Sequence, residues 1–189
     1  VVGYGNQGRA QALNLRDSGL EVVIGARYGS NTYDKAKYDG FDVCTIEQAS
    51  KSSDVISVLV PDQCADQIYK ERIHPNIKSG DVLLFSHGYN IVYKKICPPS
   101  SVDVVMVAPS GPGYAVRDEY KRGDGVPTLV AVNQDSSGNA KDIALAYSKA
   151  IGGTRSCCFI STFKEETETD LFGEQVVLTG VLPNIINES

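Results

Sequence analysis

The sequence predicts a doubly wound α/β fold, in which helices cover both faces of a mostly parallel β-sheet. Short apolar runs rich in β-branched residues alternate with polar stretches of helical periodicity, the pattern that successive βαβ units produce. No internal repeat, low-complexity segment or long Pro/Gly-rich linker interrupts this pattern before residue 160. A chain of 189 residues with 42% hydrophobic side chains can bury one such core and a small appendage.

The expected elements follow these runs in order. We expect strands at 1–2, 20–25, 41–44, 55–60, 82–86, 104–108, 128–132 and 156–160. We expect helices at 7–18, 34–38, 46–52, 62–73 and 138–151. From residue 167 onward the chain becomes acidic and amphipathic, which predicts a further helix that belongs to a region beyond the α/β unit.

Charge and hydropathy exclude two classes of partner. The net charge is −5 and no basic stripe is present, so we expect no nucleic-acid binding. No apolar run reaches the roughly 18–20 residues that cross a bilayer, and the chain opens within a pattern, so we expect a soluble protein with a clipped N-terminus. The odd number of cysteines, without metal-ligand spacing, predicts reduced thiols at Cys44, Cys64, Cys97, Cys157 and Cys158.

A glycine-rich turn joins the first strand to the first helix, at the GxGxxG spacing. Its residues are Gly3, Tyr4, Gly5, Asn6, Gln7 and Gly8. In such a turn the first glycine permits the bend, the second admits a pyrophosphate to the backbone, and the third lets helix and strand pack closely. The strand before it, the helix after it and a second strand from Leu20 favour a Rossmann dinucleotide site over a chance match.

The segment after the second strand favours NADPH. An NAD-preferring site places Asp or Glu there, roughly 20 residues after the glycines, to bind the ribose hydroxyls. This chain has no acid at that place and instead carries Arg27, Ser30 and Thr32. A guanidinium and two hydroxyls can surround a 2′-phosphate. The alternative is a solvated arginine beside an ordinary Gly-Ser-Asn turn.

Further candidates lie where three strands end, since ligands of open α/β sheets bind beyond the carboxyl ends of the strands. Asp62 and Gln63 follow one strand, His87 follows the next, and the segment 109–113 follows the third. An imidazole at this edge can act as acid, base or orienting group, although a lone histidine is often structural. His74, before Pro75, is explained by a helix C-terminal cap.

The acidic helix offers a candidate metal site. Asp170 and Glu174 are four residues apart and therefore share one helix face, where two carboxylates can converge on Mg²⁺. A solvated acidic face near a helix N-terminus is the other interpretation that this spacing allows.

Taken together, these segments are similar along the whole chain to the ketol-acid reductoisomerases, also called acetohydroxyacid isomeroreductases. The resemblance is carried by the segments 3–8, 10–19, 86–88, 107–109, 134–138 and 162–175. The last of these segments is highly specific to the family.

The resemblance implies a two-step reaction on a 2-hydroxy-2-keto acid, either 2-acetolactate or 2-aceto-2-hydroxybutyrate. Magnesium-assisted alkyl migration would be followed by hydride transfer from NADPH, in valine, isoleucine and leucine biosynthesis. It implies Asp170 and Glu174 as magnesium ligands and His87 as the active-site histidine. It also implies a 2′-phosphate loop at Arg27, Ser30 and Thr32, and further cofactor contacts at Asp62, Gln63, Cys64, Ala65 and Gly113.

The chain departs from the family pattern at Ser110, where the family has lysine after Ala-Pro. Because a hydroxyl cannot replace an ammonium charge, we expect a loss of rate, and an NADPH-binding module or inactive relative is the alternative function. A different Rossmann reductase of hydroxy acids is a third possibility, against which the segment 162–175 argues.

The resemblance also predicts how the chain divides. We expect residues 1–161 to form an NADP-binding domain and residues 162–189 to begin an all-helical metal- and substrate-binding domain, most of which this chain lacks. Homo-oligomers of the full-length protein are expected to form through that domain. The expected location is cytoplasmic in preference to organellar.

Overall fold

The computed structural model describes residues 1–188, apart from the side chains of Glu174, Gln175 and Leu178. Its strands are β1 (Val23–Gly25), β2 (Asp42–Cys44), β3 (Val55–Val58), β4 (Val82–Phe85), β5 (Asp103–Pro109), β6 (Thr128–Gln134) and β7 (Cys158–Ile160). Its α-helices are α1 (Asn6–Asp17), α2 (Asn31–Tyr38), α3 (Ile46–Ser52), α4 (Asp62–Ile68), α5 (Tyr89–Val92), α6 (Gly113–Arg122), α7 (Ala140–Ala150), α8 (Phe163–Leu171) and α9 (Leu182–Glu188). The π-helices are η1 (Tyr69–Ile73) and η4 (Phe172–Val181), and the 3-10 helices are η2 (His74–Asn76) and η3 (Gly153–Arg155).

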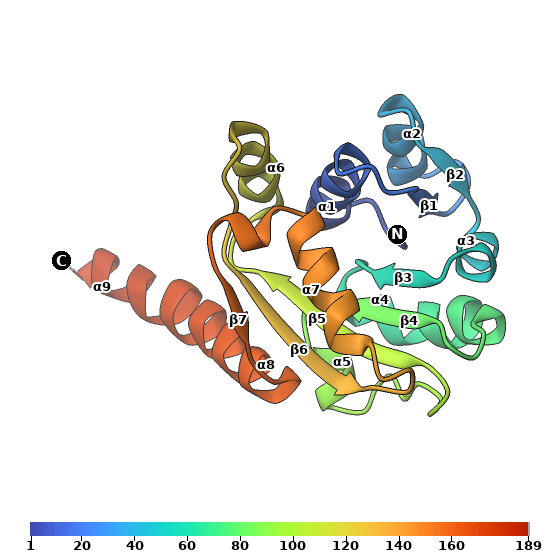
Figure 1. The fold of residues 1–189 in the computed structure, drawn as a ribbon. Helices are drawn as coiled ribbons and strands as arrows, with labels where there is room; N and C mark the ends of the chain where they lie inside the picture. Colours follow the sequence, from blue (N-terminus) through green and yellow to red (C-terminus); the bar gives the residue numbers. More distant parts are fainter. Residues whose placement is uncertain (189) are drawn as a thin grey trace.

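The strands confirm the predicted mostly parallel sheet with helices on both faces (Figure 1). A five-stranded sheet has the order β3-β4-β5-β6-β7, and β1 pairs with β2 beside it. The pairing is parallel except between β5 and β6. Val2 forms parallel bridges to both Gly25 and Val58, so the start of the chain connects the two sheets.

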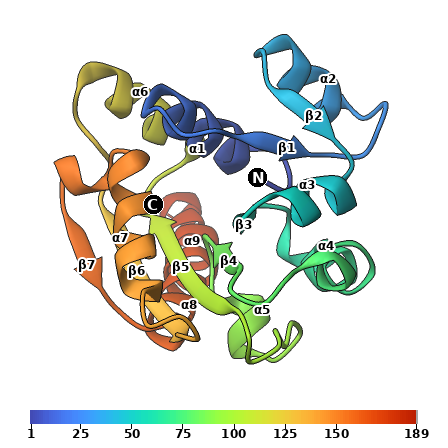
Figure 2. The same ribbon diagram turned by 45° about the vertical axis from the view of Figure 1, so that its right-hand side comes forward.

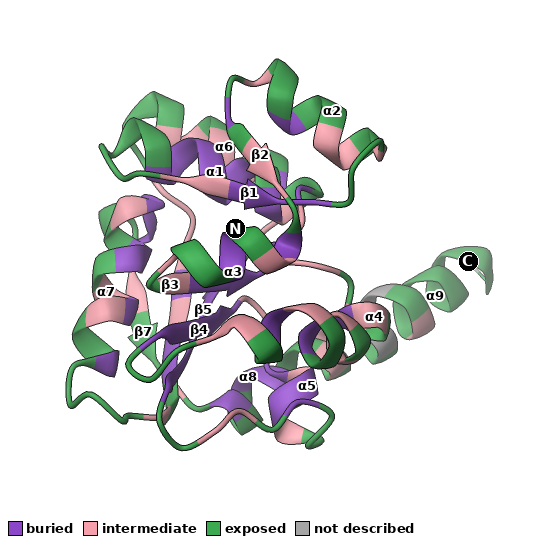
Figure 3. Ribbon diagram, turned by 90° about the vertical axis from the view of Figure 1, so that its right-hand side faces the viewer, coloured by how far each residue is buried: buried purple, intermediate pink, exposed green. Residues whose placement is uncertain are grey.

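The core lies on both faces of the sheet because successive strand residues point to opposite sides. On β4, Leu83 and Phe85 face the cluster beneath α4 and η1, whereas Leu84 faces the cluster beneath α7. Both clusters meet β5, whose residues 103–108 are all buried, as the purple strands of Figure 3 show. Figure 2 shows these layers, with α7 and α4 on opposite sides of the sheet.

Several expected boundaries were wrong. The predicted strand 20–25 is a strand only over Val23–Gly25, and the segment 1–2 forms single bridges in place of a strand. The acidic helix begins at Phe163, four residues before the predicted change, because the Thr162 side chain caps it by accepting the Glu165 N–H at 3.1 Å.

Two helices were missed, α5 and α6. Only Gly113 and Val116 of α6 are buried, so its sequence has no apolar stripe of helical period. Pro112 at its start and Gly123 at its end, with φ of +92°, are the signals that could have revealed it.

The last three helical segments, α8, η4 and α9, follow one another as a rod that projects from the α/β unit (Figure 1). Its outer part exposes large apolar side chains, including Val181, Ile185 and Ile186. No helix in residues 1–188 combines the length and apolar character needed to cross a membrane.

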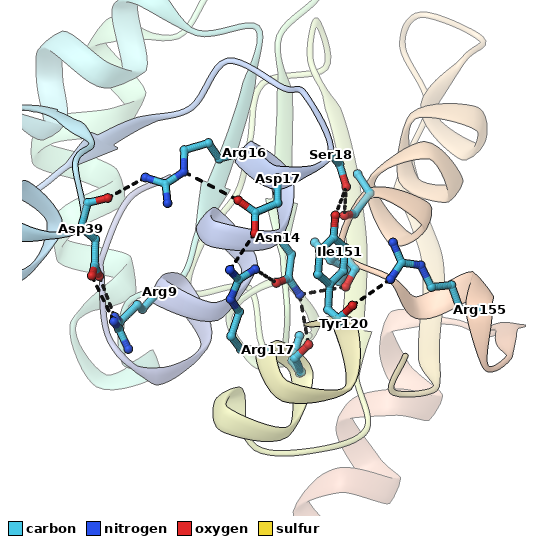
Figure 4. A network of polar contacts seen from close by, with 12 residues as sticks. Arg9, Asn14, Arg16, Asp17, Ser18, Asp39, Arg117, Tyr120, Ile151 and Arg155 are labelled. Carbon is cyan, nitrogen blue, oxygen red and sulfur yellow. Dashed lines mark hydrogen bonds and ion pairs between the residues drawn. The ribbon is translucent and has the colours of Figure 1, made fainter. Parts of the chain in front are cut away.

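A buried amide holds α1 to α6 and α7. Asn14 is fully buried, and its Nδ2 donates 3.0 Å bonds to the carbonyls of Val116 and Ile151 (Figure 4). Its Oδ1 accepts from Arg117 Nη1 at 2.8 Å, and the same guanidinium reaches Asp17 at 2.6 Å. One side chain therefore connects α1 to α6 and to the end of α7.

We predict that Asn14→Ala destabilises the fold by about 2–4 kcal/mol, because it leaves two buried carbonyls without their donor. Urea unfolding followed by circular dichroism measures the change. The control is Gln67→Ala, which removes an exposed 2.9 Å bond to Glu71 and should cost less than about 0.5 kcal/mol. Equal midpoints for the two variants would contradict the role assigned to Asn14.

Candidate functional site

The glycine turn has the shape that a dinucleotide requires. Gly3 has a φ of +92°, and a Cβ there would lie 2.7 Å from the Leu59 carbonyl oxygen. A Cβ on Gly8 would lie 2.5 Å from the Gly3 oxygen, so helix and turn touch through bare backbone. Gly5 has open space around it. The turn is therefore tight on its protein side and open on the side where a pyrophosphate would approach.

The N-terminus of α1 is free to bind an anion. Gly5 occupies the cap position and has no side chain with which to cap the first turn. The Arg9 N–H donates to the Gly5 carbonyl at 2.9 Å and so begins the helical ladder. The N–H groups of Asn6, Gln7 and Gly8, which precede Arg9 in α1, donate to no backbone carbonyl within residues 1–188. They are therefore available to bind a phosphate.

The loop after β1 places the three predicted 2′-phosphate residues at the start of α2. Ser30 caps that helix: its Oγ accepts the Tyr33 N–H at 3.3 Å and donates to the Arg27 carbonyl at 2.6 Å. Thr32 Oγ1 lies 2.9 Å from Ser30 Oγ, and the Arg27 side chain is exposed. The loop thus combines a helix N-terminus, two linked hydroxyls and an exposed guanidinium, which can all face one phosphate.

The segment after β5 packs directly on the glycine turn. Gln7 Nε2 donates to the Gly111 carbonyl at 2.8 Å, and a Cβ on Gly113 would collide with the backbone of Asn6. This contact requires glycine at position 113 for packing, a reason that the sequence did not reveal. Ser110 lies exposed at the end of β5, with its N–H bonded to the Pro127 carbonyl at 2.8 Å.

The predicted segment 62–65 opens α4 beyond the end of β3. Asp62 is half-buried, and its Oδ1 accepts from Asn90 Nδ2 at 2.9 Å. Gln63 is exposed, Cys64 donates its thiol to the Pro61 carbonyl, and Ala65 is buried in the core. Asp62 and Gln63 therefore border the site, whereas Ala65 faces the protein interior.

His87 lies beyond β4 in a cluster of carboxylates. Its Nδ1 is 3.0 Å from Glu166 Oε1 and 3.5 Å from Asp170 Oδ2, and its Nε2 is 4.0 Å from Asp62 Oδ2. Glu166 is buried, and its second oxygen accepts the Gly88 N–H at 3.0 Å. With Nδ1–H donated to Glu166, the other nitrogen faces Asp62.

The same cluster holds the pKa of His87 above its ordinary value. Burial favours the neutral ring, but the hydrogen bond and charge of Glu166, with the charges of Asp62 and Asp170, outweigh it. Burial in turn raises the pKa of Asp62, against the opposing charge of His87. A protonated imidazole beside carboxylates can hold or move a proton near neutral pH.

The absence of a side chain at Gly88 allows α8 to approach the segment that follows β4. A Cβ at this position would collide with Thr167 and lie 2.8 Å from the Phe163 carbonyl. The absence of a side chain lets the first turns of α8 rest against the end of β4. Glu166 is brought to His87 by this contact, a pairing of residues 79 positions apart. Its signal in the sequence was its place four residues before Asp170, on the same face of the acidic helix.

The predicted metal residues lie at the edge of this cluster. One ligand atom each of His87, Glu166 and Asp170 lies within 4.8 Å of the others, an arrangement that could hold a cation. Asp170 is exposed in α8, whereas Glu174 falls in the wider turns of η4 and its side chain lies outside the described residues. Asp170 and Glu166 are oxygen donors of the kind that Mg²⁺ prefers.

Two cavities differ in their relation to these residues. One of about 430 Å³ opens between α4, α5 and α8, and Asp62, His87 and Leu171 contribute to its lining. Another of about 910 Å³ is lined by Val1, Val55 and Tyr147, and none of His87, Asp62, Glu166 and Asp170 lines it. The smaller cavity is lined by His87 and Asp62, so it is the candidate for chemistry.

A buried chain of amides links the glycine turn to the His87 edge. Gln11 Nε2 donates to Gln7 Oε1 at 3.1 Å and to Ser86 Oγ at 2.9 Å, and Ser86 directly precedes His87. Tyr147 donates to Gln11 Oε1 at 2.8 Å, which fixes the orientation of the amide. The predicted cofactor turn and the predicted catalytic histidine are thus brought to one side of the sheet.

Similarity to known proteins points to one family. Residues 1–157 match the family described as "Acetohydroxy acid isomeroreductase, NADPH-binding domain". Over 188 residues the chain is 54% identical to a ketol-acid reductoisomerase (NADP(+)) of Pyrococcus abyssi, covering 100% of this chain and 57% of that protein.

Solved structures give the same result. An NADH-preferring ketol-acid reductoisomerase from an uncultured archean superposes with a TM-score of 0.95 at 47% identity, over 99% of this chain and 58% of that one. A semialdehyde dehydrogenase NAD-binding protein from Cupriavidus necator, at 16% identity and a TM-score of 0.78 over 99% of this chain and 71% of that one, shares the fold alone. The chain spans a little over half the length of the two reductoisomerases.

We predict that Glu166→Gln lowers the pKa of His87 in the metal-free protein, because burial is then opposed only by the weaker charges of Asp62 and Asp170. Histidine proton shifts followed by NMR against pH measure it. Since the folded pKa of His87 is raised, the wild-type chain should be stabilised below about pH 6.5 and lose that contribution as pH rises through the folded pKa.

The control for this titration is Glu165→Gln, which removes an exposed carboxylate of the same helix that bonds Ser161 at 2.9 Å. It should leave the His87 titration in place. Identical curves for the Glu166 and Glu165 variants would show that Glu166 does not set the protonation of His87.

Proposed function

The chain belongs to the acetohydroxy acid isomeroreductase, or ketol-acid reductoisomerase, family, and we propose on that premise that it binds NADPH for reduction of a 2-hydroxy-2-keto acid. The observation that carries the proposal is the glycine turn, closed by backbone contact at Gly3 and Gly8 and open at Gly5. The uncapped N-terminus of α1 adds amides for the pyrophosphate.

NADPH is the dinucleotide that the loop after β1 fits best. The relative from P. abyssi is named for NADP(+), whereas the archaeal structure is described as preferring NADH, so the family name alone does not choose between them. In this chain Arg27 is exposed and Ser30 begins α2. These groups favour a 2′-phosphate, which carries the negative charge that a guanidinium and a helix N-terminus bind.

Magnesium fits the carboxylate cluster through Asp170, with Glu174 proposed as its partner from the sequence. When bound, Mg²⁺ would act as a Lewis acid that polarises the ketone and hydroxyl oxygens of the substrate. Glu166 is already bonded to His87 and to the Gly88 N–H, so it is better suited to orient the histidine than to bind the ion. Asp170 is therefore proposed as the magnesium ligand, because it is exposed beside the His87–Glu166 pair.

His87 is the group that we propose to exchange a proton with the substrate. Glu166 fixes its Nδ1, and Nε2 faces Asp62 across 4.0 Å in the lining of the 430 Å³ cavity. The raised pKa keeps the ring able to donate a proton to an oxygen that gains charge during reduction. Asp62, held by Asn90, keeps this side of the cavity polar.

For the whole protein we propose a 2-acetolactate or 2-aceto-2-hydroxybutyrate reductoisomerase of branched-chain amino-acid biosynthesis. Residues 1–161 would form the NADP-binding domain, and the rod from residue 162 would begin the helical domain. Its exposed apolar side chains support this division, since they need a covering partner. Homo-oligomerisation and a cytoplasmic location remain predictions of the sequence.

A second candidate function, an NADPH-binding module without turnover, is favoured by Ser110. This residue stands at the end of β5, next to the glycine turn, and offers a hydroxyl where the family resemblance leads us to expect an ammonium group. The two candidates agree on cofactor binding and differ in catalysis. Binding and turnover must therefore be measured separately.

We predict saturable NADPH binding that Ser30→Asp with Thr32→Asp weakens by about tenfold or more, equal to ~1.4 kcal/mol or more. New carboxylates would repel the 2′-phosphate, so NADH should lose much less. Fluorescence titration with both dinucleotides measures this. The control is Ser100→Asp with Ser101→Asp, two exposed serines before β5. Equal losses for NADPH and NADH would refute the 2′-phosphate assignment.

We predict that Asp170→Asn slows 2-acetolactate-dependent NADPH oxidation with Mg²⁺ at least about 100-fold, since a Lewis acid contributes several kcal/mol. Its affinity for NADPH should not change. Absorbance at the nicotinamide band measures the rate, and Glu168→Gln, an exposed acid of the same helix, is the control. NADPH binding without oxidation, reversed by Ser110→Lys, would instead support the binding module.

A further inference from the structure

A polar cluster joins the glycine turn to α2, and of its residues only Tyr4 belongs to the predicted cofactor turn; we call Tyr4, Arg9, Arg16 and Asp39 the Asp39 clamp. Arg9 Nε and Nη2 donate to the two carboxylate oxygens of Asp39 at 2.7 and 3.1 Å. Tyr4 Oη donates to Asp39 Oδ2 at 2.8 Å. Arg16 Nη1 donates to the Asp39 carbonyl oxygen at 2.6 Å, as Figure 4 shows for the two arginines.

The clamp is more than an exposed ion pair. The Asp39 side chain is 11% exposed, and Tyr4 is 2% exposed. The hydrogen bond from Arg9 lowers the pKa of Asp39, against the effect of burial. Phe41 closes the cluster, with its ring 5.7 Å from Tyr4 and 4.4 Å beneath the Arg16 guanidinium. A bidentate pair that also satisfies a buried hydroxyl is the kind that holds its geometry.

The clamp connects the two loops that contact a dinucleotide. Tyr4 lies within the glycine turn, and Arg9 lies in α1 directly after Gly8. Asp39 is the C-terminal cap residue of α2, the helix whose N-terminal cap is Ser30. An eight-residue helix spans roughly 12 Å as a stiff rod. Holding one end of α2 against the turn therefore sets the position of its other end, where the 2′-phosphate residues lie.

Among the described residues, α2 buries little of its own surface. Of its own residues, Ala36 is the buried one. Tyr38, at its last turn, is 92% exposed. Figure 3 shows α2 at the outer edge of the fold, mostly green and pink. The polar contacts of Asp39 therefore act together with the apolar cluster of Ala36, Phe41 and the partly buried Tyr33 to hold this helix.

We propose that Asp39 is a positioning residue that holds the loop 27–32 in register with the glycine turn and thereby sets the preference for NADPH over NADH. The inference rests on the proposed NADPH site. The 2′-phosphate needs Arg27, Ser30 and the α2 N-terminus at one distance from the pyrophosphate site, because charge-assisted bonds depend on geometry. NADH lacks the 2′-phosphate, so its binding does not require the loop 27–32 at the same distance from the pyrophosphate site.

The test uses Asp39→Ala and Arg9→Met, with Glu47→Gln as the matched control. The control breaks a 2.8 Å carboxylate–guanidinium pair with Arg72 on another face of the fold. NADPH and NADH affinities are measured by fluorescence titration. We expect both clamp variants to weaken NADPH about tenfold and NADH less than about threefold, and the control to leave both unchanged. Equal weakening of the two dinucleotides, or none, overturns the proposal.

Amide hydrogen exchange without cofactor separates this inference from the proposed function. The Tyr33 N–H, bonded to Ser30 Oγ, should exchange faster in the clamp variants than in wild type or Glu47→Gln. Unchanged exchange overturns the proposal even if NADPH binds. If wild type retains neither dinucleotide, the proposed function fails, and the exchange rates alone decide whether Asp39 positions the loop. Arg9→Lys, which keeps charge but not the bidentate geometry, should give intermediate exchange.

Discussion

The close backbone contact around the glycine turn is the constraint on which the rest of the site depends. Gly3 approaches the Leu59 carbonyl, Gly8 approaches Gly3, and Gly113 approaches Asn6, each at a distance that leaves no room for a Cβ. These contacts bring the end of β3, the start of α1 and the start of α6 to one point. The proposed dinucleotide site is therefore a product of packing between three segments, of which the turn is one.

The second half of the site depends on a single contact at Gly88. Because α8 rests against bare backbone there, Glu166 reaches both His87 and the Gly88 N–H. A buried carboxylate would be costly without such partners, and the histidine supplies the compensating charge. The first turns of α8 therefore pack against the edge of the sheet, whereas the part of the rod beyond Leu171 projects away from it (Figure 1).

Buried polar groups connect these two halves through the core. Gln11 joins Gln7 of the glycine turn to Ser86 of the histidine edge, and Tyr147 holds Gln11 from the opposite side. On the outer side, the Asp39 clamp joins the same turn to α2. A displacement of the turn would therefore shift His87 and the proposed 2′-phosphate loop, because each polar group has its partner in the other element.

The sequence alone determined the fold class, the glycine turn and the family, because βαβ alternation, the glycine spacing and the segment 162–175 are local patterns. It also indicated His87, Asp62 and Asp170 as candidate site residues, although their roles are still predictions. Only the tertiary structure showed that Glu166 pairs with His87, that Gly113 is needed for packing, and that α6 is a helix. The first two depend on contacts between segments that are far apart in the chain, and the third is a helix without an apolar stripe. Neither kind of feature produces a periodic pattern in the sequence.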